Sequence, residues 1–358
     1  MEEILTTRKS AMSRRKFIRI TGTMLALAGL PRAASMAYAD VQTPASFGGP
    51  TANANFYVTS YKKTPKVDLT NWTLRIHGLV GQPLQFTYDD IKRLPSVKQM
   101  LTLECIGNPP AGGAISNAEW TGVMLRPLLE RAGVRHNAVY AAMHGADGYT
   151  TGVPVAEIMR EENWMAYLMN GVPLPPVHGY PLRLFIPGKY GMKQPKWLTE
   201  IEFVDHEFIG YWEARGESKE GWRKVNSGFF FPQFRPNNGI IDILPFSILD
   251  LLSLSEVASV KAPVDIAGWA LAGPAGIKRV EVSTDDAATW REAQLVENKS
   301  PYVWTIWKYH FAPAKPGQYV VRVRATDGEG AVQPEYNQHS RIWRSGQPRM
   351  RLEVTSVA

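Results

Sequence analysis

Cysteine is nearly absent from this 358-residue sequence, which contains a single one, Cys105. One thiol cannot build a disulfide framework, a zinc site made of several thiolates or a cysteine-linked haem. Charged residues are also modest in number, at 20% of the chain, whereas hydrophobic residues make up 44% and aromatic residues 11%. This composition excludes a disordered chain, a collagen and a coiled coil. A chain of this length buries a sizeable core, and we expect two domains.

Positive charge is in excess by +7 over the whole chain, but most of this excess lies at the N-terminus. Residues 1–39 contain seven Lys or Arg and only two Asp or Glu. The remaining 33 basic and 31 acidic residues leave residues 40–358 with a net charge of +2. The composition therefore gives no support for nucleic acid or another polyanion as a partner.

The N-terminus has the pattern of an export signal. Residues 13–18 read SRRKFI with a paired Arg14 and Arg15, an apolar run follows from 18 to 30, and Ala37-Tyr38-Ala39 supplies small residues for cleavage. The apolar run is shorter than the roughly 20 residues that a membrane span needs. We predict a twin-arginine signal peptide, cleaved after Ala39, and hence a periplasmic protein; a basic cytosolic tail is the alternative. Because this route carries folded proteins, it suggests a cofactor inserted before export.

A second apolar stretch, residues 240–254, is interrupted by Asp242, Pro245 and Asp250. We expect a buried connecting helix there, with contact to a membrane surface as the alternative.

The rest of the chain divides by its patterns into a lead-in and two domains. Residues 40–52 are rich in Pro, Gly, Ser and Thr and predict a flexible lead-in. Residues 53–257 predict an α+β domain, with strands at 72–78 and 181–187, a helix at 88–94 opened by Thr87, and a helix at 123–132 ended by Gly133. Residues 258–358 lose the helical period. Strand-like runs at 264–273, 277–284, 302–311 and 319–326 predict an immunoglobulin-like β-sandwich.

Cys105 opens a loop dense in Gly and Pro, reading Leu-Glu-Cys-Ile-Gly-Asn-Pro-Pro-Ala-Gly-Gly from residue 103. A buried, inert cysteine is one interpretation. The other is a thiolate ligand to a soft metal, because such a loop allows close backbone approach and the metal would protect the sulfur from oxidation.

The sequence resembles the sulfite oxidase family of molybdopterin enzymes in three collinear blocks over about residues 53–345. The first is the family's metal-ligand loop, matched by Cys105, Gly107, Asn108, Trp120, Gly122 and Leu125. The second, residues 178–183, 187–193 and 196–198, is similar to the family's pterin-phosphate segment. The third lies in the predicted sandwich at Gly268, residues 277–285, Thr289-Trp290 and residues 323–327, and is similar to the family's dimerisation domain.

The resemblance implies a cofactor, a set of site residues and a homodimer. The cofactor is molybdenum–molybdopterin, with Cys105 as the protein's metal ligand and Trp120 as a residue of the catalytic pocket. Arg183 and Lys196 are implied as donors to the cofactor phosphate, whose charge near −2 favours such cations. The remaining implied cofactor contacts are Asn55, Tyr57, Asp147 and His178.

The implied reaction is a two-electron oxygen-atom transfer, on a substrate expected to contain sulfur. The chain departs from the sulfite oxidases at two positions where those enzymes bind sulfite with arginine, since Thr59 and Pro110 stand there. A sulfoxide reductase, of the methionine-sulfoxide type, is therefore an alternative, and a cofactor-free secreted binding module is another. With no haem segment evident, electrons are expected to pass to or from a separate cytochrome or quinone-linked partner.

Overall fold

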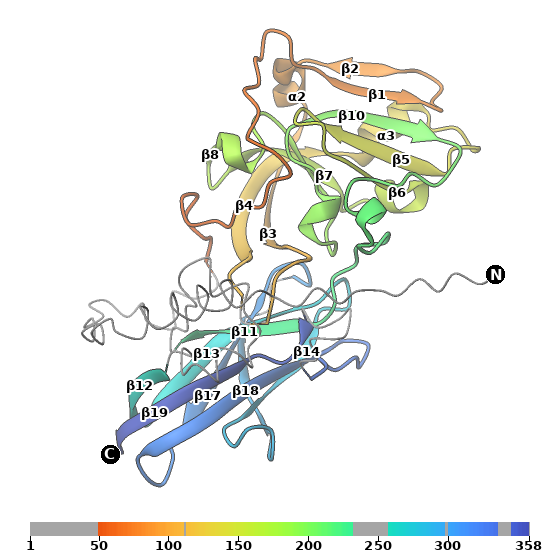
Figure 1. Cartoon of the computed structure of the whole chain (residues 1–358). Coiled ribbons are helices and arrows are strands. Elements are labelled where there is room, and N and C mark those ends of the chain that lie inside the picture. Colours follow the sequence, from red (N-terminus) through yellow and green to blue (C-terminus); the bar gives the residue numbers. More distant parts are fainter. Residues whose placement is uncertain (1–48, 111, 232–256, 298–299, 336–344, 358) are drawn as a thin grey trace, which may run out of the picture. The chain divides into compact units, whose positions relative to one another are not determined.

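A computed structural model describes residues 49–110, 112–231, 257–297, 300–335 and 345–357 (Figure 1). The predicted signal peptide, most of the predicted lead-in and the apolar stretch 240–254 lie outside these described residues. None of the helices in these ranges is long and apolar enough to cross a membrane.

The first of two sheets in the N-terminal half has the strand order β2-β1-β10-β5-β6. Its strands are β1 (Leu74–Gly78), β2 (Leu84–Phe86), β5 (Tyr140–Gly145), β6 (Thr150–Pro154) and β10 (Leu198–Val204). β1 and β10 run parallel, and the other neighbours are antiparallel. Alternate residues such as Leu74, Ile76 and Ile201 are fully buried, so one face of this sheet packs on the hydrophobic core.

The second sheet carries the loop with the single thiol. It has the order β3-β4-β7-β8, with β9 paired to β7. The strands are β3 (Ser96–Glu104), β4 (Ile115–Met124), β7 (Trp164–Met169), β8 (Val172–Pro173) and β9 (Arg183–Phe185). β3 and β4 pair in register from Ser96↔Val123 to Glu104↔Ile115, so the Cys105 loop is the connection of a long antiparallel hairpin.

Helices are few and short in the part of the chain that the structure describes. α2 (Tyr88–Arg93) confirms the predicted helix, and Thr87 closes a capping box with Asp90. α3 (Arg126–Ala132) ends at Gly133 as predicted, where the backbone is left-handed with φ of 66°. The prediction of a start at 123 was wrong, because Val123 and Met124 belong to β4. The others are α4 (Val155–Ile158) and the 3-10 turns η2 (Pro176–His178), η3 (Gly191–Lys193) and η4 (Glu213–Arg215).

The C-terminal part is a β-sandwich, as predicted. One sheet has the order β11-β13-β17-β16 and the other β12-β19-β18-β14-β15. The strands are β11 (Asn226–Phe231), β12 (Val257–Ala262), β13 (Val264–Leu271), β14 (Ile277–Ser283), β15 (Arg291–Glu292), β16 (Gln294–Glu297), β17 (Thr305–Phe311), β18 (Gly317–Asp327) and β19 (Arg349–Val357). The four predicted runs correspond to β13, β14, β17 and β18. β11 pairs with β13 although it precedes residue 258, so the sandwich includes residues on both sides of the predicted boundary.

Candidate active site

A cavity of about 240 Å³ brings together residues that are far apart in the sequence. Its polar wall includes Cys105, Asp147, His178, Arg183 and Lys196. Aromatic side chains form much of the remaining wall, among them Phe56, Tyr57, Tyr61, Tyr149, Trp197 and Trp212. The structure therefore gathers most of the predicted site residues around one space.

Cys105 directly follows the last residue of β3. Its backbone N–H donates to the Ala114 carbonyl at 2.9 Å, which closes the loop at its base. The backbone N–H of Gly107 points back at the sulfur, with N and Sγ 3.4 Å apart. The sulfur therefore accepts from a nearby backbone donor and faces the cavity.

The asparagine of the Gly-Asn pair and a later glycine of the same loop each have a structural role. Asn108 is buried and joins the two ends of the loop, because its Oδ1 accepts from the Ala114 N–H at 2.9 Å and its Nδ2 donates to Glu104 at 3.1 Å. Gly112 lies against this asparagine, where an added Cβ would come within 2.6 Å of Oδ1. The loop shape that presents Cys105 therefore depends on both residue types.

Arg183 places a buried cation in the cavity wall. It begins β9, is 6% exposed, and its nearest acceptor is the His178 carbonyl, 3.5 Å from Nη1. Its Nε has no hydrogen-bond partner among the described residues. Burial lowers the pKa of this guanidinium to about 10. A buried, under-partnered cation that lines a cavity is suited to an anionic ligand.

Lys196 lies in the same wall and is held by backbone oxygens. Its Nζ donates to the carbonyls of Thr59 at 3.0 Å and Val177 at 2.9 Å, and to a serine hydroxyl. Burial, with the positive charge of Arg183 nearby, lowers the pKa of Lys196 to about 7. An anion between the two cations would reverse this effect and keep Lys196 protonated.

His178 and Asp147 are fixed by local hydrogen bonds. His178 is buried at the end of η2, with Nε2 3.0 Å from the Asn53 carbonyl. Burial lowers the pKa of this imidazole, so it is neutral at pH 7 and donates from Nε2. Asp147 lies in the β5–β6 turn, where Oδ1 accepts the backbone N–H of Tyr149 at 2.9 Å.

Tyr57 and Asn55, the two predicted cofactor contacts nearest the N-terminus, lie in different surroundings. Tyr57 lines the cavity, and burial raises its pKa, so the phenol stays protonated and available as a donor. Asn55 is exposed and does not line the cavity. Asn53, two residues earlier, accepts two hydrogen bonds. Its backbone carbonyl accepts from His178 Nε2, and its side-chain Oδ1 accepts from Asn170 Nδ2 at 2.7 Å.

Trp120 does not line the cavity. Its ring is fully buried behind the Arg183 guanidinium, 5.7 Å from ring centroid to Cζ, and its Nε1 donates weakly to the Leu101 carbonyl. Gly122 is needed for packing, since a Cβ there would lie 1.8 Å from the Met165 carbonyl oxygen on β7. The Trp-x-Gly pattern thus builds the layer that supports Arg183, and a direct catalytic role for Trp120 stays a prediction.

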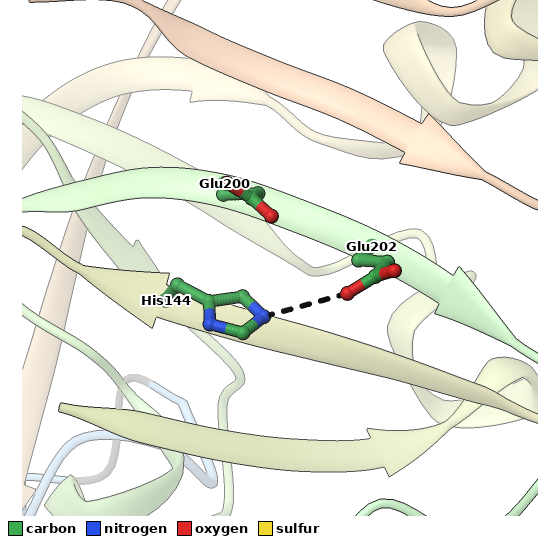
Figure 2. Close-up of side chains that lie close together, drawn as sticks. All are labelled: His144, Glu200 and Glu202. Carbon is green, nitrogen blue, oxygen red and sulfur yellow. Dashed lines mark ion pairs between the residues drawn. The ribbon is translucent and has the colours of Figure 1, made fainter. Parts of the chain in front are cut away.

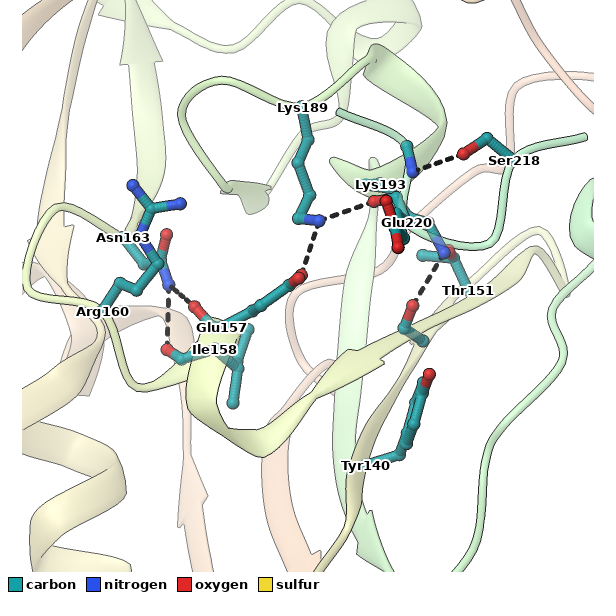
Figure 3. A network of polar contacts seen from close by, with 12 residues as sticks. Tyr140, Thr151, Glu157, Ile158, Arg160, Asn163, Lys189, Lys193, Ser218 and Glu220 are labelled. Atoms are coloured by element: carbon teal, nitrogen blue, oxygen red, sulfur yellow. Dashed lines mark hydrogen bonds and ion pairs between the residues drawn. The ribbon is translucent and has the colours of Figure 1, made fainter. Parts of the chain in front are cut away.

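Two further lysines of the second resemblance block point away from the cavity. Lys189 is fully buried and lies 2.5 Å from both Glu157 Oε2 and the Glu220 carbonyl (Figure 3). Lys193 forms a buried ion pair with Glu213 and donates to the Gly152 carbonyl at 2.8 Å. Gly191 and Met192, between them in sequence, do line the cavity. These lysines therefore fix the backbone of the wall.

The residues of the cavity fit a molybdopterin. Cys105 supplies one soft ligand, and the donor-rich pair of Arg183 and Lys196 suits a phosphate. The unpartnered Nε of Arg183 is the sharpest structural indication that this wall suits an anionic ligand, because a buried cation without a counter-charge costs free energy.

Comparison with protein families identifies a molybdopterin-enzyme domain in each half of the chain. Residues 61–212 match the oxidoreductase molybdopterin binding domain, and residues 250–345 match the Mo-co oxidoreductase dimerisation domain. The chain is 34% identical over 154 residues to the uncharacterized oxidoreductase YuiH of Bacillus subtilis, covering 43% of this chain and 76% of that protein. It is 30% identical over 324 residues to rat mitochondrial sulfite oxidase. The chain belongs to the sulfite oxidase family.

This sulfite oxidase family member differs in extent from the mitochondrial relative. The match to the rat enzyme covers 80% of this chain but only 57% of the rat sequence. The sulfane dehydrogenase SoxCD from Paracoccus pantotrophus has the same fold, with a TM-score of 0.70 at 23% identity, over 87% of this chain and 85% of that one. Family membership confirms the predicted molybdopterin-binding domain with its molybdenum cofactor and the predicted dimerisation domain.

Some cavity residues had no sequence signal. Trp212 and Glu217 come from the segment around η4 and reach the cavity only because the chain folds back there. Trp197 lies inside the second block and Gln194 directly follows its 187–193 segment, so both could have been found from their neighbours.

Proposed function

We propose that this protein is an exported molybdenum oxidoreductase that catalyses two-electron oxygen-atom transfer on a small sulfur compound. The observation that carries this proposal is the convergence of one thiol, Cys105, and two cations, the buried Arg183 and the partly buried Lys196, on a single cavity. This set matches the demands of a dithiolene metal cofactor with a phosphate tail, and family membership supports the same reaction class.

Each residue has a role that follows from its surroundings. Cys105 would hold the metal from the protein side, while Arg183 and Lys196 would bind the phosphate. The single N–H of neutral His178 is given to the Asn53 carbonyl, so His178 would offer its other ring nitrogen as an acceptor to the pterin ring, and Asp147 would also accept from it. When bound, the cofactor supplies a metal centre that exchanges two electrons and one oxygen atom with substrate.

The cavity wall favours an uncharged or weakly charged substrate over sulfite. Thr59 lines the cavity at a position where an arginine would serve a dianion. The acidic side chains of Asp147 and Glu217 share the wall with the two cations, so the cavity carries no excess positive charge beyond what a phosphate would use. A desolvated dianion without charged donors would forgo about 1.5–3 kcal/mol for each lost contact.

A sulfoxide reductase is the second candidate, and a hydrogen-bond donor in the same cavity supports it. Tyr57 stays a neutral phenol in the cavity and can donate a hydrogen bond to a sulfoxide oxygen. The two directions of catalysis share one site, because oxidation of a thioether and reduction of a sulfoxide differ only in which way the oxygen atom moves.

Export and electron transfer complete the proposal. The twin-arginine pattern in residues 13–39 supports transport of the folded protein to the periplasm. Electrons would be exchanged with a separate cytochrome or quinone-linked partner.

The test is the metal content of the exported protein. We expect about one molybdenum per chain and a Mo(V) resonance in the wild type, both lost in Cys105→Ser, with folding retained. Val172→Ala, an exposed change in β8, is the control and should keep both signals. Turnover of sulfite is then compared with that of sulfoxides and thioethers. If the protein contains no molybdenum after expression in a host that makes molybdopterin, the enzyme proposal is rejected and a cofactor-free binding module is favoured.

A further inference from the structure

A second cluster of metal-ligating side chains lies on the first sheet. His144 on β5 and Glu200 and Glu202 on β10 place their ligand atoms within 4.8 Å of one another (Figure 2). None of these residues lines the cavity.

The three side chains share a face because of strand register. Glu200 pairs directly with His144 across the antiparallel β5–β10 ladder, and Glu202 is two residues further along β10. The alternating residues Ile201, Phe203 and Met143 are buried in the core on the other face. The cluster is thus built on the rigid centre of the sheet, where strand positions are fixed.

The ring nitrogen of His144 is directed at a carboxylate without bonding to it. Nε2 lies 3.8 Å from Glu202 Oε2, too far for a hydrogen bond (Figure 2). This nitrogen is shielded from solvent and has no hydrogen-bond partner in the described part of the chain. The ring of Phe208 packs against the imidazole at 5.8 Å between centroids and gives the cluster an apolar side.

Two residues of β1 contact the central carboxylate. His77 Nε2 is 2.8 Å from Glu200 Oε1, and Arg75 forms an ion pair with Glu200 Oε2. The imidazole of His77 is placed to orient Glu200, as outer residues do around metal ligands. Arg75 is 54% exposed and can move into solvent, so it competes with a metal ion for the same carboxylate.

We propose that His144, Glu200 and Glu202 bind a divalent transition-metal ion, with zinc(II) the best match. One imidazole with two carboxylates is a ligand set that zinc accepts, and bonds of about 2.0–2.1 Å place tetrahedral ligands ~3.3 Å apart. The gap between His144 and Glu202 is close to that spacing. Such an ion would also neutralise two carboxylates on one strand face. It would join β5, which leads to Asp147, to β10, which follows Lys196.

The experiment is a zinc titration of the full exported chain without a histidine tag. Protein freed of labile metal with EDTA is titrated with ZnCl₂ against a chromophoric chelator, and thermal unfolding is followed in parallel. We expect one site, with affinity reduced at least about tenfold in His144→Ala and in Glu202→Gln. His206→Ala is the matched control, because His206 is exposed and pairs only with its neighbour Asp205.

Two further variants make the test decisive. Arg75→Gln should bind zinc more tightly than the wild type, because it removes the competing cation while keeping Glu200. The Cys105→Ser background separates this site from thiolate binding. Zinc affinity that is unchanged in His144→Ala and Glu202→Gln, or that disappears in Cys105→Ser instead, would overturn the proposal. Circular dichroism and the thermal midpoint without zinc show whether each variant is folded.

Discussion

At the scale of single residues, the cavity is defined by two neighbouring cations, one of which keeps a donor that no described protein atom satisfies. Arg183 is buried with an unpartnered Nε, and Lys196 beside it has its pKa lowered to about 7. Buried cations without a counter-ion reduce stability. Their presence together is best explained by an anionic ligand.

Replacing Arg183 by Met should separate stability from cofactor retention. In protein from a molybdopterin-deficient host, we expect Arg183→Met to unfold at a temperature equal to or above that of the wild type, because a buried charge is removed. In loaded protein, the loss of one charge-assisted contact of about 1.5–3 kcal/mol predicts roughly ten- to hundredfold weaker cofactor retention. Thermal melts and molybdenum analysis measure the two effects. A destabilised cofactor-free variant would show that Arg183 is structural.

Lys196 should make the stability of the cofactor-free protein depend on pH. Its folded pKa of about 7 is below the usual value near 10.4, so the unfolded chain binds more protons between these values. Stability should therefore rise from pH 7 to pH 9, by at most about tenfold in the folding equilibrium per pH unit.

Urea unfolding at both pH values measures this slope, and Lys196→Met should flatten it. Anion binding should flatten it as well, because a phosphate raises the pKa of Lys196. An equal slope in wild type and variant would assign the effect to other groups.

At the scale of elements, the cavity wall depends on two short turns joined by a buried ion pair. Lys193 at the end of η3 contacts Glu213 at the start of η4, and both side chains are 1% exposed. Met192 precedes the lysine and Trp212 precedes the glutamate, and both line the cavity. The pair therefore determines the position of two wall residues that come from different segments.

Breaking this pair from one side should be costly. We expect Lys193→Met to lower the free energy of unfolding by about 3–5 kcal/mol, because Glu213 is left buried and unpaired. Adding Glu213→Gln should recover more than half of the loss, since the amide still accepts the Thr151 hydroxyl that Glu213 accepts at 2.6 Å. Urea denaturation of the wild type and the three variants forms a double-mutant cycle. A coupling energy near zero would contradict this role.

At the scale of the whole molecule, the C-terminal sandwich is the part suited to assembly. Residues 250–345 match the Mo-co oxidoreductase dimerisation domain, and the two described sheets enclose a core that includes Trp307 and Leu352.

We expect the full chain to form a homodimer through this domain. Light scattering coupled to size exclusion should give twice the chain mass at micromolar concentration, in wild type and in Cys105→Ser alike, because the thiol lies in the other domain. A monomer in both would contradict the prediction, and a dimer lost only with Cys105 would place the thiol at an interface.

Much of this arrangement was visible in the sequence, where it depends on short-range patterns. Asn108 and Gly112 in the cysteine loop, Thr87 before α2 and the left-handed Gly133 act locally, and each is suited to its place for a steric or hydrogen-bonding reason. Alternation of apolar residues likewise predicted the sandwich strands. The start of α3 was misplaced because Val123 and Met124 suit a strand and a helix face equally well.

Only the tertiary structure decided which of several similar side chains reach the cavity. Lys196 lines it while Lys189 and Lys193 turn into buried ion pairs, and Tyr57 lines it while Asn55, predicted as a cofactor contact, does not. His144, Glu200 and Glu202 meet because β5 and β10 pair in one register. The sequence by itself determined the family and the cofactor class, since these depend on local residue types. The direction and partner of each side chain depend on packing between distant segments, which no local pattern contains.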